Sequence, residues 1–398
     1  MKNGLLARAT LTLVTVLALA SASGKPPQSV PTIRWSPVVG SSCGFDTDQI
    51  FPAEILALAT RRVQKLPANY LGDPNAVLGV RIISSMPDTH VRVSIRVDRL
   101  AEETGFETTI PEANQQYEIW PTLRFDTRGL AGIRESFPTT AVFSVSANGV
   151  PLGEQTQTIQ IRSVNDVPYA CRTRDGQVRD LSYLFAAFVE ENHPWIDSVS
   201  AVALKNQAIR QFIGYQGSPQ DVIHQVFAIW NVLQRRQVRY SSITRPSGQS
   251  EAITSQHVRF LDETIEASQG NCVDGTVLFA SIIYKLDMCP VLVLIPGHMF
   301  LGFHLDRQSC GQRRNWMFLE TTLIGNPGLG MLQRKWKFLN PDSSYTSSES
   351  YRQFLHALDT GNSEFQSVMN SINSRQPGYH VIEIAVARRA GISAIPRF

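Results

Sequence analysis

Three residues in the second half of the chain have the types and the order of a thiol nucleophile, its base and an orienting acid. Cys272 follows Gly270 and Asn271 where a polar loop gives way to an apolar helical pattern. The free N–H groups and the dipole of a helix start favour an anion, here the thiolate. His298 and Glu320 follow on two segments that have the alternation of paired strands. Cysteine, histidine and carboxylate in this order predict covalent catalysis by a thiolate.

The spacing of the histidine and the glutamate predicts that they meet across a hairpin. Residues 298–305 and 316–322 alternate as strands, and a polar turn between them is centred near Ser309 and Cys310. His298 then lies opposite Glu320 or within about two residues of it, where opposed Cβ atoms are about 5 Å apart. The glutamate could fix the histidine tautomer and leave the other ring nitrogen facing the thiol. His304 is six residues further along, about 20 Å away, and cannot serve as the same base.

Auxiliary roles have several candidates. The backbone N–H of Cys272 is expected to bind an oxyanion, and Tyr240 and Gln269 are the candidates for a second donor. Asp306 is the reserve candidate for the acid. A cysteine at a helix start can also be purely structural, and Glu320 can be an ordinary acid at a strand edge. No spacing typical of metal ligands supports a zinc site, so we expect no metal.

These residues resemble the transglutaminase-like superfamily of thiol enzymes. Its pattern is a Gly-x-Cys motif at a helix start, a Gly-His pair on a strand and an acid on the next strand, here Gly270-Asn271-Cys272, Gly297-His298 and Glu320-Thr321-Thr322. The similarity covers residues 180–325, and the tail at 382–396 looks like an extension of some bacterial members. Glu320 replaces the family's usual aspartate, and the proline of its Asp-Pro-Thr motif is missing. The resemblance implies a papain-like α+β domain, an acyl-thioester intermediate, amide hydrolysis rather than amine transfer, and no cofactor.

The first half of the chain has a different pattern. Residues 77–162 alternate with period two, and Asn148-Gly149 is typical of a hairpin turn. We therefore predict an antiparallel β-sandwich of immunoglobulin-like type over residues 30–165. Helical patterns follow at 180–191, 196–213 and from Ser218-Pro219 onward, with a strand at 238–243 and a loop at 244–255 near the cleft. The boundary is expected within 166–179, and the catalytic domain over 175–398.

The N-terminus and the cysteines predict the compartment. Lys2 and Arg8, an apolar stretch at 11–20 and small residues after it are typical of a signal peptide over residues 1–22. The protein is then exported, either periplasmic or secreted, without a membrane span. Five cysteines leave one thiol unpaired in an oxidising compartment. The simplest pairing is Cys43–Cys171 and Cys289–Cys310 with Cys272 free, and the alternative is that all five are reduced.

The charge composition argues against nucleic acid as a binding partner. A net charge of +3 over 398 residues, without a dense run of lysine and arginine, gives no support for nucleic-acid binding. We expect an exported thiol enzyme that acts on amide bonds of protein or peptide substrates through Cys272, His298 and Glu320. The alternative, from another class, is a non-catalytic binding or structural module that retains a relic triad.

Overall fold

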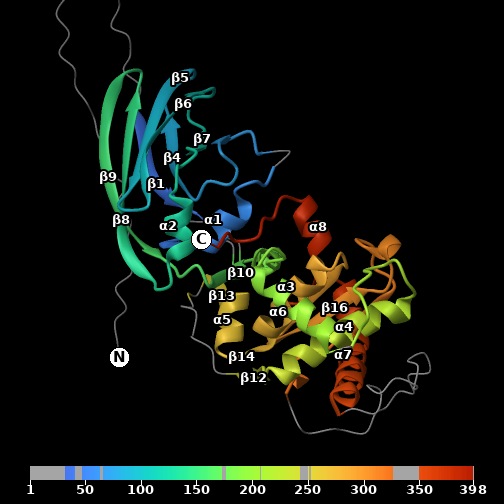
Figure 1. The fold of residues 1–398 in the computed structure, drawn as a ribbon. Coiled ribbons are helices and arrows are strands. Elements are labelled where there is room, and N and C mark those ends of the chain that lie inside the picture. The colour runs from blue at the N-terminus through green and yellow to red at the C-terminus, as the bar shows by residue number, and fades with distance from the viewer. Residues whose placement is uncertain are drawn as a thin grey trace, which may run out of the picture. The chain divides into compact units, whose positions relative to one another are not determined.

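A computed structural model describes residues 32–40, 47–62, 66–172, 176–206, 208–242, 250, 252–325 and 349–397 (Figure 1). These residues form helices together with several sheets, in agreement with the predicted α+β class. The chain divides into two compact units, one with residues up to Ile55 and Val63–Val164, the other with Leu56–Arg62 and Asn165–Arg397. The predicted signal peptide lies outside the described residues.

The first unit contains two sheets. In chain order its elements are β1 (Ile33–Val39), β2 (Gln49–Ile50), α1 (Pro52–Leu58, which continues into the second unit), β3 (Tyr70–Gly72), β4 (Leu78–Ser84), β5 (Thr89–Val97), β6 (Ala101–Ile110), β7 (Gln116–Trp120), α2 (Thr127–Gly132), β8 (Phe137–Ala147) and β9 (Val150–Ile161). The strand orders are β1-β4-β7-β3 and β2-β9-β8-β5-β6. Val91, Val93 and Ile95 of β5 are fully buried, as the alternation predicted.

The connection at Asn148 and Gly149 confirms the predicted hairpin. Ala147 pairs with Val150, and both turn residues have positive φ, at 49° and 80°, the backbone that a two-residue hairpin turn requires. The expectation of purely antiparallel pairing is wrong in two places, because β2 pairs with β9 and β3 with β7 in parallel. These short strands are far from their partners in sequence, so no tight turn fixes their direction.

The second unit contains the sheet that carries the candidate site. Its strand order is β17-β16-β15-β18, formed by Trp316–Leu319, His298–His304, Pro290–Ile295 and His380–Glu383, all antiparallel. Helix α6 (Cys272–Lys285) contacts β15 and β16, and helix α7 (Glu349–Asn373) contacts β17. Every residue of β15 is buried, which explains its continuous run of apolar side chains.

The remaining elements of the second unit lie before, between and after these strands along the chain. They are β10 (Asp166–Arg172), β11 (Val178–Asp180), the 3₁₀ helix η1 (Ser182–Phe188), α3 (Pro194–Lys205), α4 (Pro219–Arg235), β12 (Arg239–Tyr240), β13 (Ile253–His257), α5 (Leu261–Glu266), β14 (Gln269–Gly270), η2 (Arg307–Ser309), η3 (Thr321–Leu323) and α8 (Ile384–Arg389). Strands β11, β10 and β13 form one sheet, and β12 pairs with β14.

Several predicted boundaries in this unit are wrong. The helix expected over 196–213 ends at Lys205, and further along the chain the N–H groups of Ile213 and Gly214 donate to the Gln225 Oε1, each at 2.8 Å, instead of to helical carbonyls. Residues 253–255 of the expected loop belong to β13, which pairs with β10, while 244–249 and 251 lie outside the described residues. The helix expected over 180–191 is the shorter 3₁₀ helix η1 (Ser182–Phe188). Within the described ranges, no helix is long and apolar enough to cross a membrane.

The cysteines follow the predicted pairing where the structure describes them. Cys289 and Cys310 form a disulfide, and Cys272 is free. Cys171 is also disulfide-bonded, and its predicted partner Cys43 lies outside the described residues. The alternative that all five cysteines are reduced is therefore wrong.

Candidate active site

Cys272 is the first residue of α6, and a reciprocal cap fixes its position. Asn271 accepts a hydrogen bond from the Asp274 N–H at 2.9 Å, and the Asp274 carboxylate accepts from the Asn271 N–H at 3.0 Å. Burial raises the pKa of Asp274, although hydrogen bonds from the Arg259 and Asn271 N–H groups act in the opposite direction. A Cβ on Gly270 would come within 2.8 Å of the Asp274 Cβ, so a glycine is needed two residues before the cysteine.

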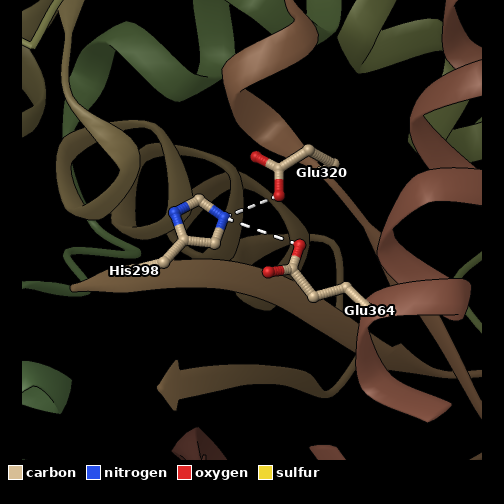
Figure 2. A group of neighbouring side chains, drawn as sticks. All are labelled: His298, Glu320 and Glu364. Atoms are coloured by element: carbon tan, nitrogen blue, oxygen red, sulfur yellow. Dashed lines mark hydrogen bonds and ion pairs between the residues drawn. The ribbon is translucent and has the colours of Figure 1, made fainter. Parts of the chain in front are cut away.

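His298 begins β16 directly after Gly297, and the strand register brings Glu320 to it. Leu301 pairs with Leu319, so Glu320 follows the end of β17 beside the start of β16. His298 Nε2 lies 2.7 Å from Glu320 Oε2. Figure 2 shows this contact, with the other ring nitrogen, Nδ1, pointing away from the carboxylate. The hairpin therefore brings together the two residues that the spacing paired.

Glu320 is held so that one carboxylate oxygen is left for the histidine. Its side chain is buried, and Oε1 accepts hydrogen bonds from the Thr322 N–H at 2.9 Å and the Thr322 Oγ1 at 2.6 Å. The Glu320 N–H donates to the Ala357 carbonyl of α7 at 3.0 Å. With Oε1 occupied and the backbone fixed, Oε2 is directed at His298.

The charge state of His298 follows from its two partners. Burial alone would lower its pKa, but hydrogen bonds with Cys272 and Glu320, together with their negative charges, raise the pKa to about 10. The ring is therefore protonated at neutral pH, and it lines the same cavity as the free thiol. An imidazolium in this position favours the thiolate, which is the nucleophilic form of cysteine.

Glu364 on α7 is a third member of this cluster that the sequence analysis missed. Its Oε2 lies 3.9 Å from His298 Nε2 (Figure 2). Burial raises the pKa of Glu364, and the charge of Glu320 and a hydrogen bond between the two carboxyl groups add to this, while His298 lowers it. The Glu364 carboxyl therefore keeps its proton to a higher pH than an exposed glutamate does.

A close approach of α7 to β17 positions Glu364. A Cβ on Gly361 would lie 2.7 Å from the Leu319 nitrogen, so only glycine allows the helix to come this near. Asn362 donates to the Phe318 carbonyl at 3.2 Å. The sequence did contain a signal for Glu364. It is a carboxylate next to the apolar helix face of Phe354, Leu358 and Phe365, and a glycine precedes it by about one turn.

Thr276 connects the elements that carry the three predicted catalytic residues. Its buried Oγ1 lies 2.7 Å from the Cys272 carbonyl oxygen, 3.3 Å from the Met299 carbonyl oxygen and 3.3 Å from the Thr321 Oγ1. Met299 follows His298, and Thr321 follows Glu320. One hydroxyl thus ties α6, β16 and η3 together.

The candidates for oxyanion donors differ in placement. Among the described residues, the Cys272 N–H has no recorded acceptor, so it is free to bind an oxyanion. Tyr240 pairs with Gly270 in the β12–β14 ladder. Burial raises the Tyr240 pKa, and the negative charges of Cys272 and Glu320 add to the shift, which places the phenol near the thiol. Gln269 pairs with Arg239 one residue earlier, so its side chain takes the opposite face from Tyr240.

The reserve acid and the second histidine lie away from the cluster. Asp306 caps η2 by accepting from the Ser309 N–H at 2.8 Å, and it bonds Ser309 Oγ and Asn315. His304 is buried, with its Nε2 3.1 Å from Glu383 Oε2 and 3.0 Å from Trp316 Nε1. Both residues have structural partners, so neither replaces Glu320 or His298.

His298, Glu320 and Glu364 could in principle hold a metal ion. One ligand atom from each lies within 4.8 Å of the others in the described part of the chain. A metal would have to displace the proton from Nε2 and break the 2.7 Å contact with Glu320. With the His298 pKa at about 10, that proton is held tightly at neutral pH. The donor set therefore suits a proton better than a metal.

A cavity of about 600 Å³ adjoins the thiol and the imidazole. Cys272 and His298 both line it, together with apolar residues of η1, α6 and β15. Its size is that of a site for a small ligand or a short peptide segment. Neither models of known protein families nor curated protein sequences match this chain, so its function is inferred from the chemistry of this site.

Proposed function

We propose that the protein is a thiol enzyme that cleaves amide bonds of proteins or peptides through Cys272, His298 and Glu320. The observation that carries the proposal is the position of His298, whose Nε2 lies 2.7 Å from the buried Glu320 carboxylate and whose ring lines the same cavity as the free Cys272 thiol. A histidine shared between a thiol and a carboxylate is the arrangement of an activated nucleophile. The adjoining cavity gives an amide substrate access to the sulfur.

The reaction would begin from the imidazolium–thiolate pair. The Cys272 sulfur attacks the amide carbon, a C–S bond forms, and the carbonyl oxygen becomes an oxyanion that the Cys272 N–H can bind. His298 donates its proton to the amide nitrogen, and the C–N bond breaks to leave an acyl-thioester. Neutral His298 then takes a proton from water and the hydroxide attacks the thioester carbon. The C–S bond breaks, which returns the thiolate beside the imidazolium and releases the acid. Glu320 keeps the ring oriented throughout.

At the level of architecture, we propose a transglutaminase-like, papain-like domain for the second unit and an immunoglobulin-like β-sandwich for the first. The support is the order of a cysteine at the start of α6, a histidine on β16 and an acid after β17, which matches the resemblance of the motifs. We also propose that the protein is exported, to a periplasm or out of the cell. Its disulfide chemistry fits an oxidising compartment.

Alkylation of the thiol by iodoacetamide over pH 5–9 tests the core of the proposal. The wild-type rate should change only severalfold between pH 6 and pH 8, because an imidazolium beside the sulfur would favour the thiolate over this range. In His298→Gln the rate should rise about tenfold per pH unit, as for an ordinary thiol with a pKa of about 8.5. Cys272→Ala must abolish labelling. A wild-type rate that follows the ordinary thiol profile would favour a non-catalytic module.

Product analysis separates hydrolysis from amine transfer. A peptide mixture incubated with the protein and a fluorescent primary amine should yield new carboxyl ends, with little amine incorporated. Predominant amine incorporation would make the enzyme a transferase and leave the thiol chemistry intact. Neither product should form with Cys272→Ala.

A further inference from the structure

We infer that the cavity beside Cys272 selects a substrate that combines an apolar side chain with a carboxylate, and that Arg375 binds this carboxylate. The inference rests on the proposed function, because it names the substrate class of the same site. Arg375 follows the C-terminal end of α7 and lines the cavity together with Cys272 and His298. It therefore lies at the same opening as the reacting sulfur.

The inner wall of the cavity is apolar. Phe185, Val273, Leu294 and Ile295 line it, and each is buried. Polar and exposed lining residues, among them Thr254 and Arg375, form its rim. An apolar substrate side chain that covers this wall would be removed from water, which is the main source of affinity in such sites.

One acid–base pair at the rim is already satisfied. His380 Nδ1 lies 3.1 Å from Asp180 Oδ2. Burial alone would raise the pKa of Asp180, but hydrogen bonds from His380 and Ser182 hold it below its usual range. Asp180 is therefore ionised and occupied by His380, so it does not neutralise Arg375.

The guanidinium of Arg375 is not paired with any residue that the structure describes. In the described part of the chain, its guanidinium has no ion pair or hydrogen bond, and the residue is exposed. His298 is also cationic, but it is balanced by Cys272 and Glu320. Arg375 is thus a rim cation without a counter-ion among the residues that the structure describes, and a guanidinium prefers a carboxylate as its partner.

The backbone conformation at Arg375 supports the inference that its side chain has a role in binding. The Gln376 N–H bonds the Ser371 carbonyl at 2.9 Å and the Arg375 N–H bonds the Ile372 carbonyl at 3.1 Å, which together form a Schellman motif. Arg375 occupies its left-handed position, with φ at 54°, where glycine is normally preferred. An arginine there needs a reason beyond ending the helix. Its favourable interaction with the helix dipole is one such reason, but it predicts no preference for acidic substrates.

Protection of Cys272 from iodoacetamide tests the inference on the full chain. Three peptides serve as probes: acetyl-Leu-Gln-amide, which is neutral, acetyl-Leu-Glu-amide, with a side-chain carboxylate, and acetyl-Leu-Gln with a free C-terminal carboxylate. Protection is expressed relative to the unprotected rate of each variant. At least one acidic peptide should protect at roughly fivefold lower concentration than the neutral peptide, as expected for an exposed ion pair. Which acidic peptide does so identifies the source of the carboxylate.

The variants assign the preference to Arg375. Arg375→Gln should remove the preference and Arg375→Lys should keep most of it. Arg352→Gln is the matched control, because Arg352 is an exposed arginine at the other end of α7, 23 residues away. The preference should also weaken between about 0.05 and 0.5 M salt.

Three outcomes would overturn the inference. These are equal protection by all three peptides, a preference that survives Arg375→Gln, and no protection at peptide concentrations of about 10 mM. Each leaves the proposed function standing if His298→Gln still changes the pH profile of alkylation. Loss of that His298 dependence would instead contradict the proposed function itself.

Discussion

At the scale of single residues, the site depends on a histidine that two neighbours keep protonated. The pKa of His298 is raised to about 10, above the ordinary 6.5, by Cys272 and Glu320. Protonation of His298 therefore stabilises the folded protein. The contribution is complete below about pH 6.5 and is lost as the pH rises through about 10. Any change that removes one of the two anions should move this titration downward.

Glu320→Gln should lower the titration midpoint of His298 by at least one pH unit, equal to about 1.4 kcal/mol. The amide keeps the size of the side chain and loses the charge that favours the imidazolium. The ring can be followed by NMR of histidine-labelled protein. Glu364→Gln is the comparison and should shift the midpoint less, since Glu364 Oε2 is 3.9 Å from the ring nitrogen rather than 2.7 Å. An unchanged midpoint in Glu320→Gln would show that this carboxylate does not hold the proton.

Glu364→Gln should also become relatively more stable than the wild type as the pH rises. Burial and the neighbouring Glu320 raise the Glu364 pKa, so ionisation of Glu364 disfavours the folded state. Wild-type stability then falls as the pH passes upward through this pKa, whereas the variant lacks the titration. The unfolding free energy of the wild type, measured with urea, should therefore fall relative to that of the variant between pH 4 and pH 7.5. A difference of the opposite sign would mean that His298 dominates the charge of Glu364.

At the scale of elements, a helix, a strand and a 3₁₀ turn must keep a fixed spacing for the site to form. Thr276→Val keeps the shape of the side chain and removes the hydroxyl that these elements share. The expected loss of unfolding free energy is about 1 kcal/mol. Alkylation at pH 6 should slow as well, because Cys272 is no longer tied to the segments that follow His298 and Glu320.

Ser281→Ala is the matched control for this prediction. Ser281 is a buried hydroxyl on the same helix, bonded to the Val277 carbonyl at 2.7 Å and to the Glu190 N–H at 2.9 Å. Its loss should reduce stability by a similar amount without slowing alkylation. Equal slowing in both variants would mean that the effect comes from general loosening of α6.

Contacts within one element pair could be predicted from the sequence, whereas contacts between elements distant in the chain could not. His298 and Glu320 lie on one hairpin, so counting residues from its turn was enough to pair them. Glu364 and Arg375 come from α7, which approaches β17 through Gly361, and no local pattern gives the contact between elements so distant in sequence. The helix predicted over 196–213 was too long at its far end, where the Gln225 side chain binds the backbone N–H groups of Ile213 and Gly214. The short parallel edge strands were missed for the same non-local reason.

At the scale of the whole molecule, the disulfide separates structural cysteines from the reactive one. Cys289 and Cys310 are 21 residues apart and enclose β15 and β16. Cys272 is the free thiol of the described residues. Oxidation can therefore strengthen the sheet that carries His298 without consuming the nucleophile.

The double variant Cys289→Ala/Cys310→Ala should lose about 3 kcal/mol of unfolding free energy, as expected for opening a loop of this length. Urea unfolding measures the loss, and the wild type treated with a reductant should lose at least as much. The double variant is the sharper test, because a reductant also acts on Cys171. A loss below about 1 kcal/mol would mean that packing alone holds β16 in place.

At the Schellman motif that ends α7, the residue best for stability differs from the residue that the proposed substrate binding needs. Arg375→Gly would relieve the left-handed backbone and should raise the unfolding free energy by up to about 1 kcal/mol, less the extra freedom of glycine in the unfolded chain. The same change would remove the cation from the rim of the cavity. A screen for thermal stability alone would therefore favour a variant with impaired substrate selection, and the arginine should return only when turnover of an acidic substrate is selected as well.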